Sequence, residues 1–136
     1  MNHHQLESLI QYRLTQSEET LWEANILLEQ SAFRGSINRS YYAMFYAALG
    51  LLATRELGTS KHSGVISLLD REFVKKGIIS KALSKSFHRA FDERQASDYG
   101  ELFEPNLQTA TNLYEQAEIF VIEIKKHLIS IGFELE

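Results

Sequence analysis

One proline in 136 residues, together with apolar residues that recur every three or four positions, most constrains how this chain can fold. The proline is Pro105, and every glycine except Gly50 falls where the apolar pattern breaks. Spacing of three and four places apolar side chains on one face of an α-helix, whereas a half-buried strand needs strict alternation. The pattern predicts an all-α fold, a four- or five-helix up-and-down bundle that forms one domain over residues 1–136.

The five expected helices span approximately residues 6–31, 36–57, 65–77, 80–91 and 105–128. Gly35 is expected to break the chain before the second helix and Ser36 to cap it. Pro105 suits the first turn of the last helix, and the polar stretch before it, residues 92–105, is expected to be rich in turns. The helix over 36–57 is apolar around most of its circumference, which predicts a central helix buried by more than one neighbour.

Composition excludes several classes of protein. The chain has no cysteine, which excludes disulfides, thiolate zinc sites and cysteine nucleophiles. Its formal net charge is −4, from 14 Lys and Arg against 18 Asp and Glu, so bulk attraction to nucleic acid is disfavoured, while a local basic cleft is still compatible with this charge. The N-terminus has neither the cationic start nor the apolar core of a secretory signal, and the longest apolar run, residues 41–53, is shorter than the roughly 20 residues of a membrane-spanning helix. We therefore expect a cytoplasmic protein with no membrane segment.

Motifs for common cofactors are also missing from the sequence. It contains no glycine-rich phosphate loop, no HExxH, no EF-hand loop and no Glu-x-x-His pair of the kind that di-iron bundles use. Glu123 and His127 lie one turn apart on the last expected helix, but two ligands do not complete a metal coordination sphere. The preferred interpretation is a solvated pair on a helix face, so neither a metal nor a cofactor is expected. His3 and His4 are expected to belong to a frayed end.

The central helix carries the first candidate site. Arg39 lies one turn from Tyr42, and Tyr41, Tyr42 and Tyr46 add three hydroxyls to a largely buried surface. Buried phenol hydroxyls usually find hydrogen-bond partners. One interpretation is a structural core in which carboxylates or carbonyls of the first and last helices bind these hydroxyls. The alternative is that Arg39 and the edge of a tyrosine line a cleft.

Two further segments are candidates for binding an anion. In Lys61-His62-Ser63-Gly64, His62 lies at the entry to a helix, where free backbone N–H groups favour negative charge, so it either binds phosphate or caps the helix. In the segment 94–99, Arg94 and Asp98 would pair on one face if the segment is helical, with Tyr99 beside them. The alternative for this segment is a local salt bridge that only stabilises a helix end.

Three stretches, NRSYYAMFYAALGLL, SKHSGVISLLDREFVKKG and ERQASDY, together resemble the HEPN family in their order and spacing. These are small all-helical proteins of bacteria and archaea that often pair with minimal nucleotidyltransferases. The resemblance covers roughly residues 37–128. It implies a helical bundle that forms a homodimer and brings two copies of a polar motif into a shared cleft, where a nucleotide or RNA would bind.

The resemblance also identifies which residues of the motif are present. In many HEPN proteins an arginine is followed, after four to six residues, by a histidine, and the pair cleaves RNA without a metal. Arg94 matches the arginine, and its role of stabilising charge on phosphorus is retained. Tyr99 stands where the histidine is expected, and a phenol titrates near 10 whereas histidine titrates at about 6.5, so weak cleavage or none is expected. Some partnered relatives are nucleotidylated on a tyrosine two positions after the histidine, and the matching residue here is Glu101.

These features together predict an HEPN-like binding or regulatory protein, the partner of a nucleotidyltransferase in a toxin–antitoxin-like pair. The first alternative is a metal-independent ribonuclease toxin, and the second is a purely structural helical adaptor. The expected site has Arg94 and Tyr99 in the positions of the catalytic motif. Arg94, Asp98, Tyr99, His62 and Arg39 are the expected ligand contacts.

Overall fold

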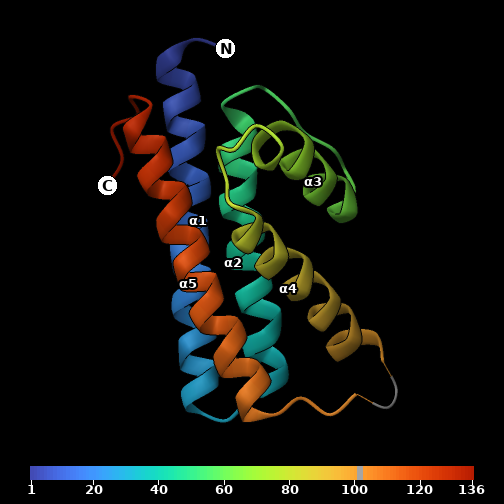
Figure 1. Ribbon diagram of the computed structural model, residues 1–136. Helices are drawn as coiled ribbons and strands as arrows, with labels where there is room; N and C mark the ends of the chain where they lie inside the picture. The colour runs from blue at the N-terminus through green and yellow to red at the C-terminus, as the bar shows by residue number, and fades with distance from the viewer. Residues whose placement is uncertain (101–102) are drawn as a thin grey trace.

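The computed structural model describes residues 1–100 and 103–136, and within them the chain forms five α-helices, one π-helical turn and no strand. The elements are α1 (His3–Glu29), α2 (Phe33–Ala53), α3 (His62–Leu69), η1 (Asp70–Val74), α4 (Lys81–Tyr99) and α5 (Leu107–Ser130). The long helices α1, α2 and α5 run side by side, and α3 and α4 lie on the other side of α2 (Figure 1). The expected all-α bundle is confirmed.

Helix α2 is the centre of the bundle, as its apolar circumference predicts. It contacts α1, α3, α4 and α5, and twelve of its residues are buried, including Ile37, Met44 and Leu51. Fully burying a side chain of this size stabilises the fold by about 1.5–3 kcal/mol. The α1 backbone passes close to α2 at Gly50, where an added Cβ would lie 3.4 Å from Cβ of Arg13.

Three helices begin earlier than expected, among them α3, which begins at His62 rather than near residue 65. Asn2 caps α1, because its side chain accepts a hydrogen bond from the backbone N–H of Gln5, so His3 and His4 are helical rather than frayed. The expected break at Gly35 and cap at Ser36 are wrong, since α2 already begins at Phe33. The hydroxyl of Ser36 is buried and donates to the backbone oxygen of Ala24 on α1, 2.9 Å away, instead of capping its own helix.

The polar stretch 92–105 is more helical than expected. Helix α4 continues to Tyr99, capped at its start by Ser80 as predicted, and ends at Gly100. An ion pair of Arg94 with Asp98, one turn apart, favours the helix over these residues. Pro105 precedes α5 rather than opening it, because Asn106 is the N-cap and accepts from the backbone N–H of Thr109.

No helix in the described part of the chain is both long enough and apolar enough to cross a membrane. Glu101, which matches the nucleotidylated tyrosine of some relatives, lies outside the described residues.

Candidate functional site

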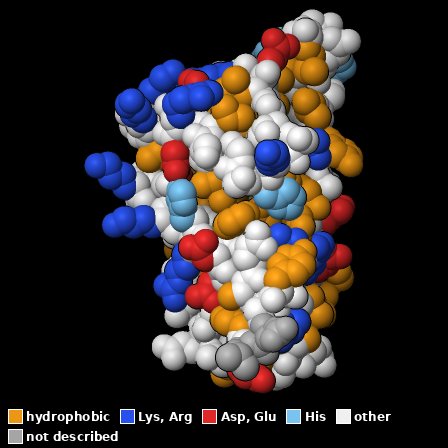
Figure 2. All heavy atoms as spheres, turned by 90° about the vertical axis from the view of Figure 1, so that its right-hand side faces the viewer, with side chains coloured by type: hydrophobic (Ala, Val, Ile, Leu, Met, Phe, Trp, Pro, Cys, Tyr) orange, Lys and Arg blue, Asp and Glu red, His pale blue; other side chains and the backbone are white. Residues whose placement is uncertain are grey.

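A hollow of about 410 Å³ opens on the side of the molecule formed by α3 and α4. Its lining comes from α2, α4 and the start of α3, and consists of Tyr42, Lys61, His62, Ser63, Phe91, Arg94 and Gln95. Figure 2 looks onto this side, where histidine and basic side chains lie among apolar ones at the surface. The hollow therefore joins two segments that the sequence keeps apart, the Lys-His-Ser-Gly turn and the arginine segment.

Gly64 allows the loop before α3 to lie close to the helix, because it has no side chain to collide with that loop. An added Cβ there would lie 2.7 Å from Cγ2 of Thr59, which is closer than real Cβ contacts. Glycine therefore lets the loop fold back over the first turn of α3. This close approach brings Lys61 and His62 to the rim of the hollow.

Arg94 is the most enclosed charged group of the site, with 13% of its side chain exposed. Its Nη2 donates to the hydroxyl of Tyr42 over 3.0 Å, and its Nε lies 3.1 Å from Oδ2 of Asp98 without hydrogen-bond geometry. Its guanidinium also lies 5.3 Å from the ring centre of Tyr42 and 5.5 Å from that of Tyr99. Arg94 is therefore oriented by aromatic and acidic neighbours while it faces the hollow.

His62 does not cap α3. Its ring stacks on Phe45, with centroids 4.3 Å apart, and its Nδ1 lies 3.0 Å from the hydroxyl of Tyr41, whereas the N-cap residue Lys61 makes no side-chain cap bond. The hydroxyls of Tyr41 and Tyr42 thus find their partners on α3 and α4, and the expected partners on the first and last helices are wrong.

The bond from Tyr41 determines which nitrogen of His62 carries hydrogen. Tyr41 is 0% exposed, and among the described residues Nδ1 of His62 is the only partner of its hydroxyl. A buried hydroxyl hydrogen without an acceptor costs about 1–3 kcal/mol, so the hydroxyl donates to Nδ1. The neutral ring of His62 then carries its hydrogen on Nε2.

Burial keeps both groups neutral at pH 7. It lowers the pKa of His62 below its ordinary value, and the nearby charge of Arg94 lowers this pKa further. Burial also raises the pKa of the Tyr41 phenol, against the opposing effect of Arg94. His62 therefore presents a hydrogen-bond donor at Nε2 and no basic lone pair there.

The lining of the hollow is rich in hydrogen-bond donors and contains no described acid. Arg94, His62, Tyr42 and Lys61, which all carry hydrogen-bond donors, belong to its lining, and no described Asp or Glu does. Charge-assisted donors of this kind bind phosphate and carboxylate oxygens. The arrangement can hold an anion, and with the hydrogen of neutral His62 on Nε2 that nitrogen offers no free lone pair to a substrate.

The other expected contacts lie beside the hollow rather than in its lining. Asp98 accepts a hydrogen bond from Asn38 as well as facing Arg94, and Tyr99 is 70% exposed. Arg39 lies 5.0 Å from the ring centre of Tyr42, donates to the side chain of Asn38 and is 3.8 Å from Glu23. Arg94 and His62 therefore line the same hollow, and Asp98 and Tyr99 lie next to Arg94. Arg39 lies outside the lining and contacts Tyr42 and Asn38.

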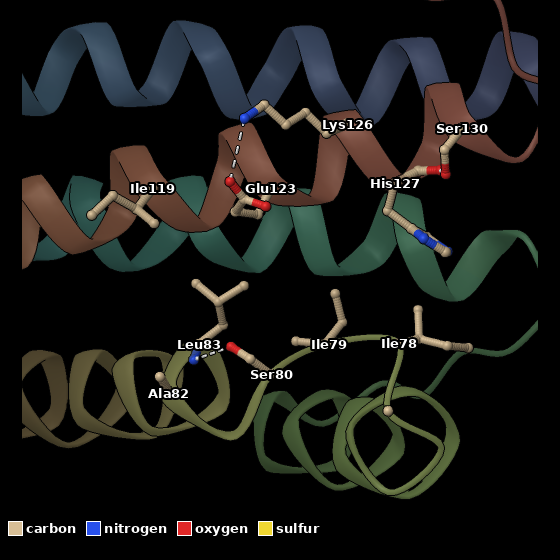
Figure 3. Close-up of a pocket in the computed structure, with 11 residues that line it drawn as sticks. Ile78, Ile79, Ser80, Ala82, Leu83, Ile119, Glu123, Lys126, His127 and Ser130 are labelled. Atoms are coloured by element: carbon tan, nitrogen blue, oxygen red, sulfur yellow. Dashed lines mark hydrogen bonds and ion pairs between the residues drawn. The ribbon is translucent and has the colours of Figure 1, made fainter.

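A second hollow, of about 670 Å³, lies between α5 and the turn that precedes α4. Glu123 lies 3.5 Å from Lys126 in it and turns toward that lysine, away from His127 (Figure 3). Burial lowers the pKa of His127, and the charge of Arg55 lowers it further. No group of three potential metal ligands occurs among the described residues.

The sequence suggested both His62 and Arg94 as ligand contacts, but it did not predict that these residues, 32 positions apart, line the same hollow. The sequence offered one signal, the polar Lys-His-Ser-Gly turn at a helix start. It did not show that Tyr41, one helix away, would bind that histidine, because this contact depends on how α2 and α3 pack.

Comparison with known proteins agrees with the resemblance. Residues 10–128 match the family model of the HEPN domain. A "UPF0332 protein" of Thermotoga maritima is 39% identical over 120 residues, which cover 88% of this chain and 91% of that protein. Two proteins of Methanocaldococcus jannaschii, each described as a "putative toxin", are 35% and 32% identical and align with 90% and 93% of this chain, and with 90% and 83% of their own lengths.

Proposed function

Since this chain belongs to the HEPN family, we propose that it is a toxin-like binding protein that takes a phosphate-bearing ligand, a nucleotide or RNA, into the hollow around Arg94. The observation that carries this proposal is the convergence of donors from three elements on one hollow: Arg94 from α4, His62 from α3 and Tyr42 from α2. Phosphate oxygens accept several hydrogen bonds at once and match this set.

We propose further that the protein acts as a homodimer, as the binding or regulatory partner of a nucleotidyltransferase in a toxin–antitoxin-like pair. The names of the two Methanocaldococcus relatives support the toxin-like part. The partner is tested by whether a nucleotidyltransferase encoded next to this gene is purified together with the chain.

The binding site is tested with Arg94→Ala. Losing charge-assisted hydrogen bonds of about 1.5–3 kcal/mol weakens binding about 10- to 100-fold, so we expect a loss of this size for AMP and for a short RNA strand, measured by calorimetry or fluorescence anisotropy. Arg39→Gln is the matched control, because Arg39 lies outside the lining and its replacement should leave both affinities nearly unchanged. Equal binding of AMP by Arg94→Ala and the natural protein would contradict the proposed site.

A second candidate function, metal-independent ribonuclease, is favoured by the presence of His62 in the same hollow as Arg94. The hydrogen on Nε2 argues against it, since a general base needs a free lone pair. We expect no cleavage of single-stranded RNA by the natural protein with a chelator present. Cleavage that disappears in both Arg94→Ala and His62→Gln would establish the ribonuclease instead.

A further inference from the structure

Opposite charges are concentrated in two separate parts of this chain. Helix α1 contains five Glu and one Arg, a net charge of −4. Residues 73–91 contain five Lys and Arg and no Asp or Glu, a net charge of +5, and Asp92 and Glu93 end this basic stretch. Helix α2 lies between α1 and α4 (Figure 1), and among the described residues no ion pair joins the two parts. The two charges therefore do not pair within one chain.

The outer face of α1 carries exposed apolar side chains among its acids. Trp22 is 66% exposed, and Ile26, one turn further along, is exposed as well. Glu19 and Glu23 lie on the same face, because positions 19, 22, 23 and 26 follow the helical spacing of i, i+3, i+4 and i+7. Tryptophan is highly buried on average and is enriched at the centres of protein–protein interfaces. This face therefore presents an apolar surface that has no cover within its own chain.

The second hollow, between α5 and the turn before α4, has the complementary character, and we call it the α4–α5 groove. Four large aliphatic side chains belong to its lining: Ile78, Ile79, Leu83 and Ile119. Leu83 points from α4 toward α5 (Figure 3). Glu123, the one described acid of the lining, is paired with Lys126. The volume of about 670 Å³ falls in the range of roughly 300–1,000 Å³ that is typical of ligand sites, so an indole ring fits.

Positive charge borders this groove along α4. Lys85 and Arg89 share a face of the helix with Ala82, which lines the groove, because they follow it by three and seven residues. Both side chains are exposed, and neither has a carboxylate within ion-pair distance among the described residues. An apolar groove with free cations on its rim matches a helix that carries apolar side chains with acids beside them.

We propose that the outer face of α1 from a second copy of this chain docks in the α4–α5 groove. Trp22 then enters the apolar hollow, and Glu19 and Glu23 face Lys85 and Arg89. Helices that bind in grooves place their anchors at i, i+3, i+4 and i+7, which is the spacing on α1. The aliphatic lining favours a protein over a nucleic acid as the occupant. The contact goes beyond the proposed function and is separate from the proposed homodimer, whose shared cleft is the hollow around Arg94.

The fluorescence of Trp22 reports this contact directly, because it is the only tryptophan of the chain. As the protein concentration rises from the nanomolar to the submillimolar range, we expect the emission maximum to move to shorter wavelength and quenching by acrylamide to fall. The weight-average mass from sedimentation equilibrium should rise over the same range. Added salt should shift both transitions to higher concentration, since exposed charges are screened.

The first variant, Ile119→Asp, places a carboxylate in the groove and should remove the change in Trp22 emission. The matched control is Ile129→Asp on the same helix, since Ile129 is outside the lining and is 49% exposed against 54% for Ile119. The control should keep the natural change in emission. Circular dichroism and thermal unfolding establish that both variants are folded.

A charge exchange tests the pairing itself. The groove variant, Lys85→Glu, Arg89→Glu, and the helix variant, Glu19→Lys, Glu23→Lys, each bring like charges together, so each alone should self-associate about 10- to 100-fold more weakly. A mixture of the two should associate, because each supplies the surface that the other has lost. The variant with all four reversals should regain the natural association, which a merely destabilised protein would not do.

The proposal is overturned if Trp22 emission is the same at every concentration, or if Ile119→Asp retains the natural change. It is also overturned if the groove variant associates as the natural protein does, or if the four reversals together fail to restore association. Failure of the homodimer around Arg94 would leave these results unchanged, because Trp22 lies on α1, on the other side of α2 from that hollow.

Discussion

Buried hydroxyl groups have different kinds of hydrogen-bond partner on the two sides of α2. On the side of α1, buried hydroxyls reach backbone carbonyls: Ser17 of α1 donates to Ala43, and Ser36 of α2 donates to Ala24. On the side of α3 and α4, phenol hydroxyls of α2 reach other side chains, with Tyr41 bound to His62.

This difference separates scaffold from site. A carbonyl has one chemical state, so a hydroxyl bound to it only fixes two helices together. A histidine or arginine can also bind a ligand or, for histidine, take up a proton, so a hydroxyl bound to it sets the state of that group. Variants on the α1 side should therefore change stability alone, and variants on the other side should change binding at a smaller cost in stability.

The largest expected effect is on the scaffold, in Leu14→Ala. Leu14 is 0% exposed on α1, and truncating a buried leucine typically costs about 2–5 kcal/mol. Urea unfolding should show this loss in the free energy of unfolding, while the folded fraction binds AMP as the natural protein does. If the fully folded variant bound AMP more weakly than the natural protein, the effects of the two sides of α2 on stability and on binding would not be separable.

A smaller effect is expected for Tyr41→Phe, which removes the hydroxyl and leaves the ring. The free energy of unfolding should fall by about 1 kcal/mol, as for one hydrogen bond. With no donor on Nδ1, the hydrogen of His62 is no longer confined to Nε2, and nitrogen NMR of labelled histidine should show hydrogen on both ring nitrogens. An unchanged spectrum would show that Tyr41 does not select the tautomer.

The smallest effect concerns pH. Because the pKa of His62 is lowered in the folded protein, the unfolded chain binds more protons between that pKa and about 6.5, so stability falls as pH drops through this window. A bound phosphate favours the charged imidazole, so AMP should bind more tightly as pH falls from 7.5 to 6. Both trends should be weaker in His62→Gln, measured by thermal unfolding and calorimetry. His127 has a lowered pKa as well, so part of the stability trend should persist in that variant.

Much of the scaffold could be predicted from the sequence because its determinants are local. Apolar spacing identifies the helices, and the apolar circumference of 36–57 identifies α2 as central. The errors are at helix ends, where a tertiary contact competes with a local one. Ser36 has the right side chain for a cap, but its hydroxyl is better satisfied by the carbonyl of Ala24.

The site could be predicted only in its parts. The pairing of Arg94 with Asp98 is local, since one helical turn separates them. The position of Arg39 outside the hollow and the proximity of Arg94 to His62 depend on how α2, α3 and α4 pack. The spacing of residues in the sequence does not indicate this packing. The comparison with the family motif directs attention to Tyr99, whereas the histidine that lies in the same hollow as Arg94 comes from α3.

The π-helical turn η1, which continues α3, determines how a change of length in this part of the chain would be tolerated. A π-turn contains one more residue than an α-turn, and each residue of an α-helix advances the side chains by about 100° around its axis. The extra residue of Asp70–Val74 is accommodated within that turn, so deleting one residue there would let α3 continue as a regular α-helix and would leave the side chains on either side near their present orientation. The same deletion inside the first half of α4 would instead rotate Arg94 by about 100° relative to the start of that helix, away from Tyr42.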